Sequence, residues 1–198
     1  MLAFGGAKHI VVVDFVHIDT VLLKPLYALV LIEHGTRRTH LPGVTAHLMG
    51  AWATQAARNA PMDLDLGGRA AQVKYLIRDR DSRFTAAFDA VFQAEDIQIP
   101  RSPVRAPRAN AVCERMIGTL RRELLDRILI LHEEHLRRVL TEWVHHYAHG
   151  RPHRSLGQLT PDQAEHEPPL PINLAEHRVC CRAILGGLTH EGWTATAA

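Results

Sequence analysis

The order of the apolar segments is the feature that most constrains the fold of this chain. Three β-branched, apolar runs come first, at residues 10–22, 26–34 and 38–46. A helical pattern follows at 47–60, and strand and helix patterns then alternate. They are a strand at 73–79, a helix at 84–96, a strand at 97–100 and helices at 109–128 and 132–149. Strands in a meander followed by strand–helix–strand–helix predict an α/β fold of three layers, with a mixed sheet flanked by helices.

The length of 198 residues suits one domain with a sizeable core and an appendage. We expect the core to occupy residues 1–157. Residues 158–198 are predicted to be a C-terminal arm, in which a proline-containing linker precedes two short strands around Gly186 and Gly187.

The apolar runs also limit where the protein can reside. The runs at 10–13 and 27–32 are far too short to cross a bilayer, and the first residues contain no small-residue cleavage site. The three cysteines, of which Cys180 and Cys181 are adjacent, form neither a disulfide framework nor the Cys-x-x-Cys spacing of a zinc site. We therefore expect a cytoplasmic protein with no membrane association and with reduced thiols.

Positive charge is concentrated in one segment. The net charge is only +2, which does not by itself indicate a nucleic-acid partner. Between residues 101 and 127, however, seven arginines stand against three acidic residues, in one predicted loop and helix. This segment is predicted to face phosphates.

Asp14 interrupts the apolar run VVVDFV, where a central strand is expected. A buried carboxylate is costly unless it is ligated or neutralised, so Asp14 is a candidate metal ligand. The alternative is a strand-edge aspartate bonded to a neighbouring loop. Asp19 competes for the same role, but it lies five residues on and therefore on the opposite face of the strand.

Two further carboxylates follow ends of predicted elements. Asp79 ends the strand KYLIR, at the edge where open α/β sheets place catalytic groups, although Asp81 and Ser82 suit a helix cap and one acid of this turn can serve the turn alone. Glu114 follows Asn110, a plausible N-cap, and falls in the first turn of a helix, whose positive end favours a carboxylate. A solvated surface glutamate is the alternative reading of Glu114.

The helix that carries Glu114 has two distinct faces. Its apolar residues repeat every four positions and form the predicted core stripe: Val112, Met116, Leu120 and Leu124. Glu114 and Arg121 lie along another face. A carboxylate with an arginine two turns later suits a face that holds a metal ion and contacts a phosphate beside it.

Four short motifs occur in order along residues 10–158. Asp14 precedes the strand pattern LYALVLIEHGTR at 26–37, and Asp79 opens the turn Asp-Arg-Asp-Ser-Arg-Phe. Glu114 closes Asn-Ala-Val-Cys-Glu, and the pattern YAHGRPHRSL follows at 147–156. Together they resemble the integrase core shared by retroviral integrases and insertion-sequence transposases.

The resemblance implies a ribonuclease H-like fold and a DNA transposase or integrase activity, in which DNA strands are cleaved and transferred without a covalent protein intermediate. In that family the catalytic acids are two aspartates and a glutamate, so the match selects Asp14 over Asp19 and adds Asp79 and Glu114. These three residues are expected to hold two Mg²⁺ or Mn²⁺ ions. The residues expected to contact DNA are Arg108, Asn110, Arg121 and Arg122.

The sequence departs from the family pattern at two positions beside the motifs. Arg80 and Asp81 replace the usual Asn-Gly, and Ala148 replaces the asparagine of the closing motif. Only 13 residues precede Asp14, which leaves no room for the helix-turn-helix segment of related transposases. We expect a homo-oligomer on double-stranded DNA, at element ends and target, with a separate DNA-recognition domain or subunit.

Three other functions are compatible with parts of the pattern. A truncated, non-catalytic DNA-binding remnant or regulator of transposition would need no divalent metal. A plain ribonuclease H-like nuclease would hydrolyse strands but never join them. A zinc site is suggested by His145 and His149, one helical turn apart, but no further ligands with recognisable spacing accompany them.

Overall fold

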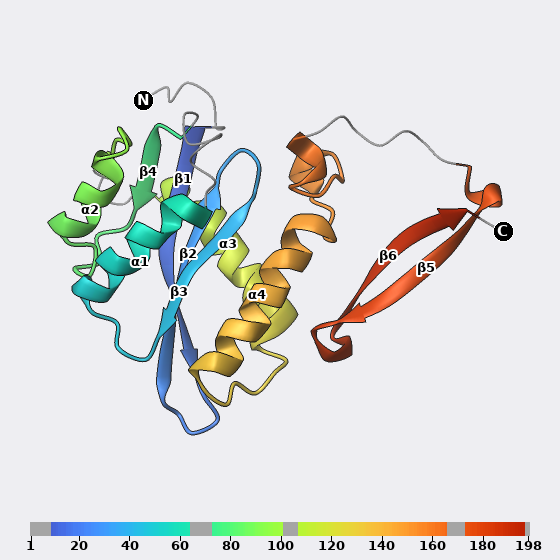
Figure 1. Cartoon of the computed structure of the whole chain (residues 1–198), viewed down its shortest axis with the longest axis horizontal. Helices are drawn as coiled ribbons and strands as arrows, with labels where there is room; N and C mark the ends of the chain where they lie inside the picture. The colour runs from blue at the N-terminus through green and yellow to red at the C-terminus, as the bar shows by residue number, and fades with distance from the viewer. Residues whose placement is uncertain (1–8, 64–72, 101–106, 166–172, 197–198) are drawn as a thin grey trace.

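A computed structural model describes residues 9–63, 73–100, 107–165 and 173–196 of the chain. Its central sheet has four strands in the order β3-β2-β1-β4. They are β1 (Ile10–Asp19), β2 (Pro25–Glu33), β3 (Thr39–Thr45) and β4 (Tyr75–Arg78). The first three pair antiparallel as a meander, and β4 pairs parallel with β1. The predicted mixed sheet is thus confirmed (Figure 1).

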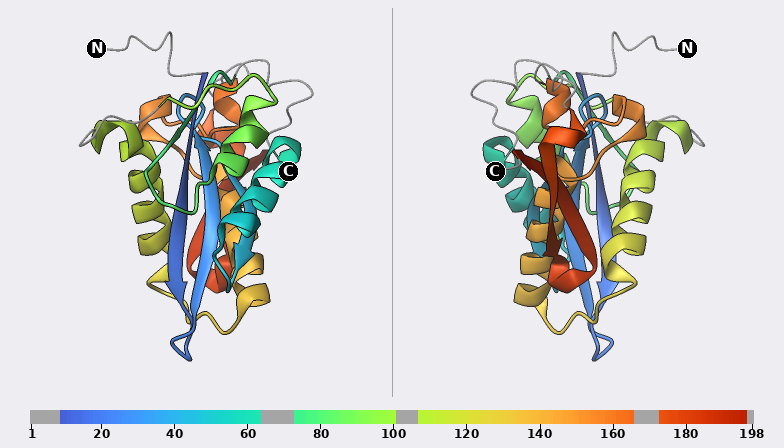
Figure 2. Two further views of the ribbon diagram at one scale, coloured as in Figure 1. Left: turned by 90° about the vertical axis from the view of Figure 1, so that its left-hand side faces the viewer. Right: turned by 90° about the vertical axis from the view of Figure 1, so that its right-hand side faces the viewer.

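Helices cover both faces of the sheet, which gives three layers (Figures 1 and 2). Two helices, α1 (Gly50–Asp63) and α2 (Ala86–Gln93), lie on one face. The other face carries α3 (Pro107–Leu120) and α4 (Glu133–His149). In the part of the chain that the structure describes, no helix is long and apolar enough to span a membrane.

The alternation of β1 divides its residues between two apolar cores. Even-numbered residues such as Val12 and Val16 pack with Met116 and Trp143, on the side of α3 and α4. Odd-numbered residues pack with α1 and α2, in a second cluster that includes Val11, Val13, Ala53 and Phe88. Because successive side chains of a strand point to opposite faces, Asp14 belongs to the face that α3 covers.

The structure corrects two predicted elements. Residues 97–100 do not form the expected strand: the segment makes one parallel bridge, between Gln98 and Tyr75. Pro100 follows at once and has no N–H to extend the ladder. The helix expected at 109–128 begins at Pro107, leaves α geometry after Leu120 and continues as a π-helical turn, Arg121–Leu125.

The C-terminal region forms a separate two-stranded sheet of β5 (His177–Ile184) and β6 (Thr189–Thr196). Its turn contains Gly186 and Gly187 with φ of 65° and 91°, a left-handed conformation that glycine adopts without strain. The hairpin extends away from the sheet and touches the core at its turn (Figure 1). The division into a core at 1–157 and an arm at 158–198 stays a prediction.

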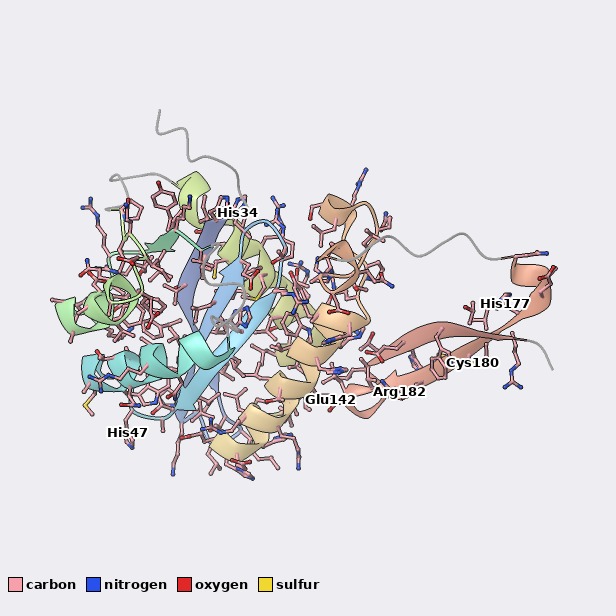
Figure 3. The ribbon with its side chains drawn as sticks, turned by 45° about the horizontal axis from the view of Figure 1, so that its top comes forward. His34, His47, Glu142, His177, Cys180 and Arg182 are labelled. Atoms are coloured by element: carbon pink, nitrogen blue, oxygen red, sulfur yellow. The ribbon has the colours of Figure 1, made fainter. Side chains whose placement is uncertain are left out.

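The turn of the hairpin is anchored on α4. Leu185 is buried in the core cluster, and its N–H donates to Glu142 Oε1 at 2.6 Å. His146 Nδ1 lies 3.0 Å from Glu191 Oε1, and Arg182 donates to the other carboxylate oxygen of Glu191 at 2.7 Å. Glu142 and Arg182 both line the contact between α4 and the hairpin (Figure 3).

Candidate active site

The register of β1 and β4 places two of the predicted carboxylates side by side. Val13 of β1 pairs with Arg78 of β4, at the last position of the parallel ladder. Asp14 and Asp79 are the next residues on the two strands, and neighbouring strands lie about 4.8 Å apart. Asp14 is half-buried and Asp79 is exposed. The two aspartates therefore meet at the carboxyl edge of the strands, where open α/β sheets hold ligands.

Helix α3 brings Glu114 to the same region. Cys113, the preceding residue, is fully buried against the sheet, whereas Glu114 is exposed. Burial raises the pKa of the Cys113 thiol well above its ordinary value, and the negative charges of Asp14, Glu114 and Asp79 raise it further. One thiol thus lies in the electrostatic field of all three carboxylates, which come from β1, the end of β4 and α3.

Local hydrogen bonds orient the two aspartates. The N–H of Phe15 donates to Asp14 Oδ1 at 2.8 Å, and the N–H of Asp81 donates to Asp79 Oδ1 at 3.0 Å. Each bond fixes one carboxylate oxygen against the backbone, so the direction of the carboxylate is set by the strand end itself.

Arg78 fixes the backbone beside Asp79. Its guanidinium donates two hydrogen bonds to the carboxylate of Asp89 on α2, at 2.9 and 2.8 Å. A third bond, at 3.0 Å, goes to the carbonyl oxygen of Asp79. Such a forked pair has a defined geometry. The pair connects α2 to the end of β4, and Arg78 thereby holds the backbone of Asp79 in place.

The competing acids have other positions. Asp81 accepts the N–H of Arg83 at 2.9 Å and pairs with its guanidinium at 2.9 Å, so it serves the turn. Asp19 lies at the far end of β1 on the opposite face, 3.4 Å from His17 Nε2, with 57% of its side chain exposed. Asp19 therefore lies away from the β1–β4 edge, whereas Asp81 lies beside Asp79 but has its carboxylate bound to Arg83.

The donor set at this edge suits a hard cation. Three carboxylates offer the oxygen ligands that Mg²⁺ and Mn²⁺ prefer. Among the described residues, however, no group of three or more His, Cys, Asp or Glu side chains is arranged to hold a metal ion. The carboxylates converge by fold and charge, without the closer approach that shared ligation of one ion requires.

The four residues predicted to contact DNA differ in exposure and in hydrogen bonding. Arg121 is half-buried and donates to the carbonyl oxygen of His17 at 2.8 Å, which attaches the end of α3 to β1. Arg122 is exposed and donates to Thr119 Oγ1 at 3.3 Å. The side chains of Arg108 and Asn110 lie outside the described part of the structure. A DNA-contacting role for these four residues stays a prediction.

Sequence reasoning did not anticipate the contributions of Cys113 and Arg78. Cys113 is not part of the predicted core stripe of α3, but it lies next to Val112 and three residues before Met116, which belong to that stripe. The Arg78–Asp89 pair joins a strand to a helix across 11 residues, and no local spacing rule links such positions. The nearest available signal was the placement of Arg78 directly before Asp79.

Comparisons with known proteins concern one segment of the chain and its fold. Residues 95–161 match the family model described as the integrase core domain. No curated protein sequence matches the chain significantly.

Solved structures match the fold over 70–96% of this chain. A chain of the simian T-cell lymphotropic virus intasome, solved with PP2A regulatory subunit B56 gamma, aligns with TM-score 0.63 and 15% identity, over 96% of this chain and 67% of that chain. The HTLV-2 integrase catalytic core domain with magnesium gives TM-score 0.54 and 12% identity, over 81% and 97%. The catalytic domain of Mos1 mariner transposase gives 0.54 and 16%, over 70% and 71%.

The fold is therefore that of the ribonuclease H-like integrase and transposase cores. Within that class, the segment at residues 95–161 is similar to the integrase core domain. The resemblance found in the sequence motifs is confirmed, as is the predicted fold class.

Proposed function

We propose that the chain is the catalytic core of a DNA transposase or integrase, which cleaves DNA strands and transfers them to a target with divalent metal ions. The observation that carries the proposal is the β1–β4 register, which puts Asp14 and Asp79 side by side at the carboxyl edge of the two strands, on the face covered by α3, the helix that carries Glu114. Asp14, Asp79 and Glu114 would hold the metal ions.

The bound ions would supply Lewis acidity at the attacking and leaving oxygens of the phosphodiester. The protein's own contribution is to hold the carboxylates. The β1–β4 ladder sets the spacing of the aspartates, α3 carries Glu114 over the sheet, and the Arg78–Asp89 pair fixes the backbone of Asp79. Cys113, beside Glu114 on α3, is fully buried, and this burial raises the pKa of its thiol.

The solved neighbours support the cofactor and the assembly. The HTLV-2 core is described with magnesium in dimeric and trimeric forms, and the Mos1 catalytic domain with Mg or Mn. For this chain we propose two Mg²⁺ or Mn²⁺ ions and a homo-oligomer bound to double-stranded DNA in the cytoplasm. Arg108, Asn110, Arg121 and Arg122 would contact the DNA backbone, and a separate domain or subunit would recognise element ends.

The test is cleavage and strand transfer on labelled duplexes that carry the sequences flanking the protein's own gene, with Mg²⁺ or Mn²⁺. Wild type and Glu114→Gln are compared, with Glu134→Gln as a matched control. Glu134 is an exposed glutamate at the start of α4, so its loss removes one carboxylate from a helix N-terminus far from the carboxylate edge.

Each outcome separates the candidate functions. Metal-dependent joined products, lost in Glu114→Gln and kept in Glu134→Gln, support the proposal. Hydrolysis without joining indicates a ribonuclease H-like nuclease instead. DNA binding without products in any of the three proteins indicates the non-catalytic remnant or regulator.

A further inference from the structure

The closing motif at residues 147–156 surrounds a cavity that the carboxylate site does not use. The cavity has a volume of about 180 Å³ and lies where α3, the β2–β3 turn and the segment after α4 meet. That segment and α3 line the cavity together, with Arg154 from the segment and Arg115 from the helix. At about 30 Å³ per molecule, the space holds roughly six waters. The cavity is thus large enough for a small hydrated group.

Four arginines line this cavity: Arg37 from the β2–β3 turn, Arg115 from α3, and Arg151 and Arg154 from the closing motif. Among the described residues that line it, there is no aspartate or glutamate. Arg115 is the residue after Glu114, so the cavity lies beside the carboxylate site on the same turn of α3.

The charges of these arginines are unequally compensated. Arg151 pairs with Glu123 at 2.9 Å and lies 5.6 Å from the centre of the Tyr147 ring. In the described part of the chain, the side chains of Arg37, Arg115 and Arg154 have no hydrogen bond or carboxylate partner. Three of the four arginines that line this cavity therefore have no compensating partner among the described residues.

Burial and repulsion act on the innermost of these charges. Arg37 is half-buried, and its pKa is lowered by burial and by the positive charge of Arg115, against the opposing effect of Tyr147. The pKa of His153 is also lowered, by burial and by the charges of Arg151 and Arg37, although its bond to the Tyr147 carbonyl and the charge of Glu123 act in the opposite direction. An anion in the cavity would relieve both effects.

We propose that this cavity binds a phosphate group, and that in the DNA-bound protein the group is a backbone phosphate. The guanidinium forks of Arg37, Arg115 and Arg154 suit the several oxygens of one phosphate. Only the choice of DNA as the source of the phosphate rests on the proposed function. The cavity thereby gives the closing motif a role in holding the DNA strand close to Glu114.

The test is DNA binding without catalysis. Fluorescence anisotropy of a labelled duplex is measured over a range of salt, without divalent metal and in a Glu114→Gln background. The double variant Arg115→Gln/Arg154→Gln is compared with Arg58→Gln/Arg138→Gln, which removes two exposed arginines outside the cavity. Arg115 and Arg154 are exposed, so circular dichroism melting should be unchanged in both double variants.

The cavity variant should lose about tenfold in affinity at moderate salt, and its slope of log K against log salt should fall by about one relative to the control, as expected for one phosphate. Equal affinity and slope in the two double variants would overturn the DNA assignment.

Calorimetric titration with inorganic phosphate distinguishes a free phosphate from a DNA phosphate as the occupant of the cavity. If the cavity variant loses phosphate binding but keeps its DNA affinity, the site takes a free phosphate. If wild type binds neither phosphate nor DNA through the cavity, the proposal fails. If the cavity variant shows the binding defect while the protein with Glu114 intact yields no cleavage products with Mg²⁺ or Mn²⁺, this inference stands and the proposed function is overturned.

Discussion

Asp14 and Asp79 are the first residues beyond the last pair of a parallel ladder, Val13 with Arg78. They lie 65 positions apart in the sequence, and their proximity results entirely from the pairing of β1 with β4. The two carboxylates consequently repel each other in the metal-free protein.

Replacing Asp14 by Asn should remove a ligand and relieve that repulsion. We expect the Mn²⁺ affinity, measured by calorimetry, to fall by more than about tenfold, since even residues behind the ligands cost 10- to 100-fold. The free energy of unfolding in urea should not decrease. Asp19→Asn is the control, because Asp19 lies on the opposite face and is exposed. Equal losses in the two variants would contradict the assignment of Asp14.

Asp89 should act on the site through Arg78. Asp89→Asn weakens the two-pronged pair with Arg78, of which only about a fifth of each side chain is exposed. We expect a loss of about 1–2 kcal/mol in unfolding free energy and a higher Mn²⁺ concentration for half-maximal cleavage. Glu133→Gln breaks the exposed pair with Arg137 and should cost only about 0.3–0.5 kcal/mol, with no change in the metal requirement. An unaltered metal requirement in Asp89→Asn would show that Arg78 does not position Asp79.

Gly150 controls how the hairpin sits on α4. A Cβ at this position would lie 2.5 Å from Glu191 Oε1 and 2.7 Å from His146 Nδ1. Gly150→Ala should therefore displace Glu191 and accelerate hydrogen exchange of the amides at 177–196, at a cost of about 1–3 kcal/mol. In Gly192→Ala the nearest contact is 3.7 Å, to the Cys180 carbonyl, and exchange should stay as in wild type. Unchanged exchange in Gly150→Ala would mean that the hairpin does not depend on this contact.

The anchoring of the hairpin should depend on pH. The hydrogen bond from His146 lowers the pKa of Glu191 below its ordinary value of 4.5, with Arg182 assisting and burial opposing. A lowered folded-state pKa contributes stability above about pH 4.5 that is lost as the pH falls through the folded pKa. The protection factors of the amides at 177–196, which compare the observed exchange with the intrinsic rate at the same pH, should thus fall in acid, and Glu191→Gln should remove this dependence. An acid response that persists in Glu191→Gln would assign it to another group.

Thiol reactivity should distinguish the three cysteines. Cys113 is fully buried, Cys180 is half-buried and Cys181 is exposed. In the native protein, a chromogenic disulfide reagent should therefore titrate two thiols, and the third should react only on unfolding in guanidinium. Cys180 lies on the hairpin (Figure 3), so Cys180→Ser should remove one of the two native signals. Reaction of three thiols without denaturant would contradict the placement of Cys113.

The elements that could be predicted are those with strong local patterns. The alternation in β1 indicated which face Asp14 occupies and separated it from Asp19, and the four-residue apolar repeat of α3 identified Met116 and Leu120 as core. The run IQIP has the composition of a strand. A segment this short forms a ladder only if a neighbouring strand pairs along its length, and here Gln98 makes a single bridge to Tyr75.

Long-range contacts could not be derived from spacing. The pairing of Asp14 with Asp79 came from family resemblance, since no local rule sets the register of strands so far apart in the sequence. Arg121 was expected to face DNA, and its bond to the His17 carbonyl joins residues 104 positions apart. The π-helical turn at Arg121–Leu125 has no composition that distinguishes it from a continuing α-helix.

The hairpin attached by its turn has a mechanical consequence. Its strands have eight residues each, and at about 3.3 Å per residue the free end lies roughly 25 Å from the anchor. A rotation of about 10° at the turn would then sweep the far end through about 4 Å, by the same strand geometry. The contacts of Leu185 and Glu191 with α4 thus act as a pivot. Small changes at these contacts would produce much larger displacements at the free end of the hairpin.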